Sequence, residues 1–282
     1  MANARKLFLA SIFVSALLVT SCGGNSQNSY TSLEGNWHLA GGEAPSQYPL
    51  LTLAIGVSGN MVYGSGDVGV NCSSGDAAIG SSFTVTGQIA SDGTFTLTNV
   101  PTNSAFPLNT IQVVIRGKVP AKGATTWAGN FTITNAATET TCTFDVSSNF
   151  AAVLYPPVNG TYAGTLTGRG FDSGITVATS ITQGAFTPLP APSSIPPSYY
   201  NPLSATITVT GSSCFTSGTT NSSLSSISGE HFTLIYAMDD GSTLHLSGWF
   251  SDPSELTVQP AIASVINGKC NGAFGSGTLN RQ

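Results

Sequence analysis

The feature that most constrains the fold is a pair of alternating apolar runs on either side of an Asp-Asp-Gly turn. Residues 232–238 (Phe-Thr-Leu-Ile-Tyr-Ala-Met) lead into the turn at 239–241, and residues 242–250 follow it. A three-residue loop with Gly241 in a left-handed conformation suits this hairpin. A two-residue loop would shift the register by one residue and mix the two faces. The three-residue loop predicts one apolar face and the cross-strand pairs Leu234–Leu246 and Tyr236–Leu244.

A second hairpin is predicted nearer the N-terminus. Residues 83–89 lead to Ser-Asp-Gly at 91–93, and residues 95–97 return, although the apolar phase relative to the turn glycine is shifted by one residue. Other short apolar segments are predicted strands: 51–57, 111–119, 126–134, 175–181, 205–209 and 255–258. Short strands between turn residues are typical of antiparallel sandwiches and barrels.

Composition favours the same fold class. Only 7% of the residues are charged and 32 are glycine, and glycine costs about 1 kcal/mol in a helix interior. The hydrophobic fraction of 40% is large enough to build a core, so a folded body is expected and not a disordered chain. We expect an all-β protein, either an antiparallel β-sandwich or barrel-like sheets, with no helix beyond an N-terminal signal helix that is removed.

Two segments share an order of features, which predicts two loosely repeated halves. Leu-Glu-Gly-Asn-Trp at 33–37 corresponds to Val-Asn-Gly-Thr-Tyr at 158–162, and each is followed by apolar alternation, a cysteine, an Asp-Gly hairpin and a second cysteine. The halves span 33–156 and 157–282. The second half carries a proline-rich insert at 186–202.

The first residues have the parts of an export signal. Arg5 and Lys6 precede an apolar stretch at 7–18, which at about twelve residues is shorter than the roughly twenty that span a bilayer. Val-Thr-Ser-Cys follows at 19–22.

Val19-Thr20-Ser21-Cys22 resembles the lipobox of bacterial lipoproteins. The resemblance implies that residues 1–21 are a signal peptide that is removed. It also implies that Cys22 then carries a diacylglyceryl thioether and an N-acyl chain such as palmitate. Residues 22–32 would be a flexible tether, and Gly23 in place of aspartate favours the outer membrane over the inner one. Membrane lipid, held through the acylated Cys22, is therefore an expected partner.

The four other cysteines are expected to form two disulfides, because their number is even and the chain is expected to be exported. They are Cys72, Cys142, Cys214 and Cys270. Three connectivities are open; the repeat favours Cys72–Cys142 and Cys214–Cys270. A zinc site is disfavoured because no pair has CxxC spacing.

The segments that resemble catalytic or nucleotide-binding motifs have simpler structural interpretations. Residues 64–69 match GxGxxG but open no helix, so a glycine-rich turn is expected and not a nucleotide site. The acids Asp239, Asp240, Asp252 and Glu255 gather at hairpin ends, where turn formation is more common than glycosidase chemistry. We expect no catalytic set and no cofactor.

The histidines and tryptophans are likewise expected to be structural. The hairpin register places His231 opposite Trp249 and His245 opposite Ile235, and His38 is distant in sequence. No third ligand for a metal is indicated. Trp37, Trp127 and Trp249 are expected to pack in the core or at the rim and not to form a sugar-stacking platform.

The proline-rich insert is expected to be extended and exposed. Tyr199 and Tyr200 near its end are candidate contacts of a binding loop, against the alternative of a tolerated insertion between strands.

These features favour a non-enzymatic envelope binding protein that holds either a small apolar ligand inside a barrel or an envelope-protein partner on its surface. One alternative is a structural or adhesive protein that contacts glycan, and another is a hydrolase of envelope polymers. Without Arg5 and Lys6 the chain has six basic and thirteen acidic residues, a net charge of 6 − 13 = −7. Nucleic acid is therefore not an expected partner.

Overall fold

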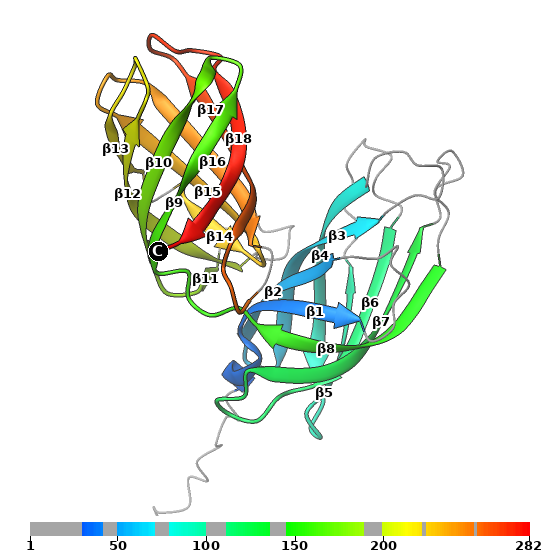
Figure 1. Ribbon diagram of the computed structural model, residues 1–282. Coiled ribbons are helices and arrows are strands. Elements are labelled where there is room, and N and C mark those ends of the chain that lie inside the picture. The colour runs from blue at the N-terminus through cyan, green and yellow to red at the C-terminus, as the bar shows by residue number, and fades with distance from the viewer. Residues whose placement is uncertain are drawn as a thin grey trace, which may run out of the picture.

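The protein folds into two antiparallel β-barrels that lie next to each other (Figure 1). The computed structural model describes residues 30–41, 50–70, 79–99, 111–135, 145–188, 199–221, 224–250 and 253–282. The predicted signal peptide and Cys22 lie outside these residues. The expectation of an all-β protein in two loosely repeated halves is confirmed, and the halves are barrels and not sandwiches.

The first barrel contains eight strands, each hydrogen-bonded to the next in sequence, and β1 pairs with β8 to close it. A short 3-10 helix, η1 (Tyr30–Leu33), precedes the first strand. The strands are β1 (Gly35–Gly41), β2 (Leu50–Ser58), β3 (Met61–Val70), β4 (Ile79–Ile89), β5 (Thr94–Asn99), β6 (Ile111–Lys118), β7 (Thr126–Asn135) and β8 (Asp145–Leu154).

The second barrel repeats this up-and-down order, with two short strands sharing the fourth position. Pairing of β18 with β9 and of β10 with β12 closes it, and β11 adds to the edge of β12. The strands are β9 (Gly160–Gly168), β10 (Phe171–Gln183), β11 (Thr187–Pro188), β12 (Tyr199–Thr210), β13 (Ser217–Thr220), β14 (Ser226–Ser228), β15 (His231–Met238), β16 (Thr243–Phe250), β17 (Val258–Ile266) and β18 (Phe274–Arg281).

The repeated motif opens each barrel in the same way. Gly35 and Gly160 begin their barrels' first strands at φ 143° and 140°, a backbone conformation that favours glycine. Two residues later, Trp37 and Tyr162 are fully buried. Each ring donates a hydrogen bond to the carbonyl oxygen four residues earlier, Trp37 Nε1 at 2.9 Å and Tyr162 Oη at 3.2 Å. In each barrel, the motif therefore places a buried aromatic side chain in the first strand and bonds it to the segment before that strand.

The predicted hairpin at 232–250 has the expected register. Leu234 pairs with Leu246 and Tyr236 with Leu244, and Gly241 has φ 83°. The alternation of buried and partly exposed residues along β15 and β16 is regular. In the hairpin at 83–97, the apolar positions are shifted by one residue relative to the turn glycine. The strand order explains this shift, because the 91–93 turn joins the fourth and fifth strands of its barrel, whereas the 239–241 turn joins the fifth and sixth. The two Asp-Gly hairpins are thus not equivalent in the repeat.

Both barrels bury hydrophobic side chains in their interiors. In the second barrel these come from β9 through β18. In the first, they include a group of aromatic rings, in which Trp127 makes edge-on contacts with Trp37, Phe95 and Phe150 at centroid distances of 6.0, 5.4 and 4.9 Å. Eight strands leave an interior that side chains can fill, and these clusters occupy it in the described residues.

A short linker and a polar junction join the barrels. The linker, 155–159, contains two prolines, which restrict its backbone. Asn36 on the outer face of β1 is 6% exposed. Its Nδ2 donates to Asn201 Oδ1 at 2.8 Å, and its Oδ1 accepts from the Gly229 amide at 2.8 Å. Glu230 is also buried, and Tyr155 donates to its Oε2 at 3.1 Å. Because both barrels supply partners, the junction fixes their relative placement.

Three sequence-based expectations were wrong. Residues 64–69 lie within strand β3 and not in a turn; Gly66 is required there because a Cβ would lie 2.1 Å from the Thr52 carbonyl oxygen. The expected strand at 255–258 is replaced by a strand that begins at Val258. The end of the proline-rich insert is not a free extended loop, because residues 199–202 begin β12 and pair with β11 and β14.

Of the cysteines, Cys214 and Cys270 form the expected disulfide, with Cα atoms 6.1 Å apart. They lie in the loops between the third and fourth and between the seventh and eighth strand positions of the second barrel. Cys72 and Cys142 lie outside the described residues, in the corresponding connections of the first barrel's sequence. Their pairing stays a prediction, and the matching positions in the repeat support it.

Candidate functional site

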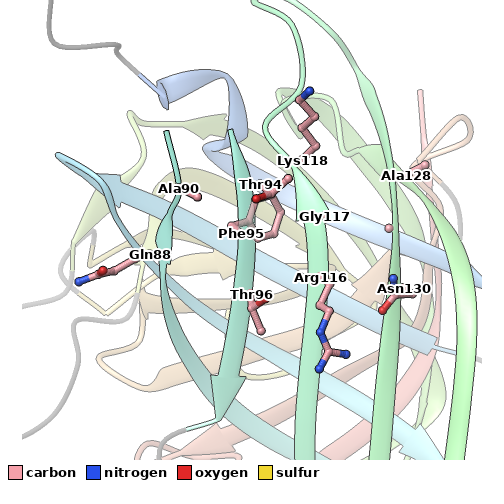
Figure 2. Close-up of a pocket in the computed structure, with 11 residues that line it drawn as sticks. Gln88, Ala90, Thr94, Phe95, Thr96, Arg116, Gly117, Lys118, Ala128 and Asn130 are labelled. Carbon is pink, nitrogen blue, oxygen red and sulfur yellow. The ribbon is translucent and has the colours of Figure 1, made fainter. Parts of the chain in front are cut away.

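Among the residues that the structure describes, a groove on the outer wall of the first barrel is the best candidate site. It has a volume of about 580 Å³ and runs over strands β4 to β7 (Figure 2). This volume lies within the range of roughly 300–1,000 Å³ typical of small-molecule sites. The lining residues are Gln88, Ala90, Thr94, Phe95, Thr96, Arg116, Gly117, Lys118, Ala128, Gly129 and Asn130.

The register of the strands aligns polar side chains in one row across this wall. Gln88 pairs with Thr96, Thr96 with Arg116, Arg116 with Asn130, and Asn130 with Asn149 on β8. All five are exposed and point outward, since their neighbours along each strand face the interior. We call these five residues the polar row. With strands about 4.8 Å apart, it extends about 19 Å.

The side chains of the polar row keep their hydrogen-bonding groups available. Within the described part of the chain, none of the five side chains has a hydrogen-bond or ion-pair partner. A neighbouring outward pair behaves differently, because Thr132 and Ser147 bond to each other at 2.9 Å between hydroxyl oxygens. The row can therefore offer amide, hydroxyl and guanidinium groups to a ligand.

Inward-facing glycines shape the floor of the groove. Gly117 pairs with Gly129, and a Cβ on Gly117 would lie 2.7 Å from the Trp127 ring. A Cβ on Gly129 would lie 2.2 Å from the Arg116 carbonyl oxygen and 2.7 Å from the Phe150 ring. Glycine in a strand interior often marks a bend or a close approach of another group. The aromatic cluster of the core thus reaches up to the backbone that forms the groove.

The groove is basic in an acidic protein. It contains Arg116 and Lys118, and none of its eleven lining residues is acidic, while the full chain has a net charge of −5. Asp92, next to the groove in the turn that precedes Thr94, accepts hydrogen bonds at Oδ1 from the amide and hydroxyl of Thr94. These bonds, with a smaller contribution from Lys118, hold the pKa of Asp92 below its usual 3.8. Asp92 therefore stays ionised near neutral pH, and its charge interacts with that of Lys118.

A smaller cavity of about 250 Å³ lies beside the disulfide in the second barrel. Arg169 and Lys269 flank it, and Lys269 Nζ donates to the Ser213 carbonyl oxygen at 3.2 Å. Lys269 is thus already used to hold two loops together, which makes this cavity a weaker candidate than the groove.

The tyrosines of the proline-rich insert are not at a loop tip. Tyr199 pairs with Pro188 and Tyr200 with Thr187, and Tyr200 is half-buried. Residues 189–198 of the insert lie outside the described residues.

The hairpin-end acids that the structure describes do not converge in a cleft. Asp239 and Asp240 sit in the β15–β16 turn, and Glu255 lies beyond the other end of β16. An eight-residue strand is about 27 Å long, so Glu255 is far beyond the separations of about 5 or 6.5–9.5 Å that glycosidase carboxylates use. Asp239 instead accepts hydrogen bonds from the hydroxyl of Thr216 and from the amides of Thr216 and Ser217, and these bonds lower its pKa. Asp240 accepts from the amide of Ser242 at 2.9 Å. Asp252 lies outside the described residues.

The histidines and tryptophans are distributed as structural residues. His38 lies at the barrel junction, where its Nδ1 is 3.4 Å from the Tyr155 hydroxyl oxygen. His231 packs against Trp249 at a centroid distance of 5.0 Å, with the rings tilted by 43°, on the outer wall of the second barrel. Trp37 and Trp127 are in the core. No cluster of three or more His, Cys, Asp or Glu that could hold a metal is present among the described residues.

Sequence reasoning did not identify the polar row. The alternation of apolar and polar residues along each strand would have placed each member on an outward face. Only the registers between the five strands bring the members into one row. No helix in the described residues is both long and apolar enough to cross a bilayer. Comparison of the chain with protein-family models and with curated proteins gives no match.

Proposed function

We propose that this chain is an exported, lipid-anchored envelope protein that binds a ligand or partner without transforming it, and that the groove on β4–β7 is where it binds. The observation that carries the proposal is the polar row, five outward side chains in register whose hydrogen-bonding groups have no partner in the described structure. Surface hydrogen-bonding groups arranged in this way suit recognition of a polar ligand.

The anchor follows from the lipobox-like residues 19–22 and the signal-like residues before them. Acylation at Cys22 would hold the barrels near a membrane, and the outer membrane is the favoured location. Because η1 begins at Tyr30, the tether would comprise residues 22–29. A flexible tether of eight residues reaches roughly 14–17 Å, so the first barrel would lie close to the bilayer.

Two other functions have less support. An apolar ligand inside a barrel would have to displace the buried clusters of both interiors. Hydrolysis by the hairpin acids is disfavoured by their separation and by the hydrogen bonds that Asp239 and Asp240 make within the fold.

An adhesive role toward glycan is compatible with the proposed site, because it would use the same outer groove.

Site-specific photo-crosslinking in cells tests the proposal. A photoreactive residue replaces Thr96 in the groove, and the matched control places it at Thr206, an exposed threonine on the outer face of β12. We expect a defined adduct with an envelope component from position 96 and none from position 206. Equal adducts from both positions, or none from either, would contradict the proposed site.

The anchor is tested separately by Cys22→Ala. We expect the wild-type protein to fractionate with membranes and the variant to be released into the soluble envelope fraction. Membrane retention of the variant would contradict lipid anchoring without bearing on the groove.

A further inference from the structure

We infer that the ligand of the groove is an extended acidic glycan, a polysaccharide bearing carboxylate or other anionic groups, which lies along the polar row with one anionic group at Arg116. This inference rests on the proposed function, since it names the ligand class for the same groove. It has three supports: the spacing of the row, the charge of the groove, and the kinds of side chain present.

The spacing suits a repeating hydroxyl-rich chain. Members of the polar row come from adjacent strands, so they are about 4.8 Å apart, close to the length of one pyranose unit in an extended glycan. The row runs across the strands from Gln88 to Asn149. A glycan of several units could therefore place hydroxyl groups against successive amide and hydroxyl side chains.

The charge suits an anion at the middle of the row. Arg116 is the central member, with Thr96 on one side and Asn130 on the other. Lys118 lies two residues further along the same strand and the same face. The guanidinium group binds carboxylate through two parallel hydrogen bonds, and within the described residues Arg116 has no ion-pair partner that would compete.

The mixture of side chains favours a glycan over a nucleic acid. The polar row has four neutral hydrogen-bonding groups and one cation, which matches many hydroxyls with sparse acid groups. A nucleic acid carries a phosphate at every nucleotide, and its single-stranded forms bind through exposed aromatic rings. The aromatic residue that lines the groove, Phe95, is only 3% exposed. With no exposed ring to stack on, binding should be modest, with a Kd of about 10 µM to 1 mM.

The test compares an acidic glycan with its neutral counterpart. Biolayer interferometry measures binding of polygalacturonate oligomers, and of the same oligomers as methyl esters, to the mature chain carrying Cys22→Ser. Three variants are compared: Arg116→Gln removes the central charge, Asn130→Ala removes a neutral member of the row, and Lys122→Gln removes one charge outside the groove. Circular dichroism verifies that each variant is folded, as expected for exposed positions.

We expect the acidic oligomer to bind more tightly than the ester, and its binding to weaken at higher salt. Arg116→Gln should weaken binding of the acidic oligomer about five- to tenfold and leave the ester unchanged. Asn130→Ala should weaken the binding of both oligomers, and Lys122→Gln should change neither dissociation constant by more than about twofold.

Each contrary result has a defined meaning. If the ester binds as tightly as the acidic oligomer and only Asn130→Ala weakens their binding, the ligand is not an acidic glycan, although the groove is still the binding site. If the acidic oligomer does not bind, or binds with no effect of either groove variant, the glycan assignment is overturned. Crosslinking at position 96 then decides separately whether the groove binds anything. If a single-stranded oligonucleotide competes as well as polygalacturonate, the groove is a non-selective polyanion surface, and the inference is also overturned.

Discussion

Removal of the Asn36 side chain should weaken the coupling between the two barrels. Asn36 is 6% exposed and its amide makes two hydrogen bonds of 2.8 Å, one to Asn201 and one to the Gly229 amide. Asn36→Ala would leave the Gly229 N–H and the Asn201 Oδ1 without these partners inside the junction. A buried polar group left without a partner costs about 1–3 kcal/mol, so the two together should lower the free energy of unfolding by about 2–6 kcal/mol.

Urea denaturation followed by circular dichroism measures this loss, and Asn149→Ala is the matched control because Asn149 is exposed on the same barrel. The control should change stability by less than about 0.5 kcal/mol. Asn201→Ala and the double variant complete a cycle, in which residues in contact should show a coupling energy of about 1 kcal/mol or more. If Asn36→Ala behaves like the control, or if the two single changes are additive, the junction does not depend on this hydrogen bond.

Three further predictions concern the second barrel. Tyr162→Phe removes the hydroxyl that bonds to the Val158 carbonyl and should lower stability by about 1 kcal/mol; an unchanged urea midpoint would contradict this role. Cys214→Ser opens a disulfide between residues 56 apart in sequence. In the chain-entropy model it should cost about 4 kcal/mol, seen as a lower Tm, and an equal Tm would contradict the linkage to Cys270. Thr216 and Ser217 hold the pKa of Asp239 below 3.8 in the folded protein. Its contribution to the free energy of unfolding is therefore complete at pH values above its pKa in the unfolded chain, and it is lost as the pH falls through its pKa in the folded protein. Asp239→Asn should therefore flatten the loss of stability below about pH 4, and an acid limb as steep as that of the wild type would refute it.

The local elements of the fold could be predicted because their signals are local. Alternation and the turn glycine determine the 232–250 register, since a shift of one residue would bury polar side chains. The paired motifs at 33–37 and 158–162 predicted the repeat because each requires glycine and a buried aromatic ring at fixed spacing.

Expectations failed where the structure depends on distant contacts. Gly66 appears in sequence to belong to a turn, yet it is needed because the backbone of β2 approaches β3 closely. Tyr200 lies in a proline-rich segment, yet β11 and β12 pair there. The polar row depends on four successive strand registers, and no single segment of the sequence carries that information.

Arginine-specific footprinting tests the central claim, that the groove is a binding surface in the cell envelope. Phenylglyoxal modification of Arg116 is measured by mass spectrometry in intact envelopes and in the purified protein, with the exposed Arg169 of the second barrel as the internal reference. We expect Arg116 to be protected in envelopes and reactive once purified, while Arg169 reacts equally in both. Equal modification of Arg116 in the two preparations would contradict the assignment of the groove as the binding site.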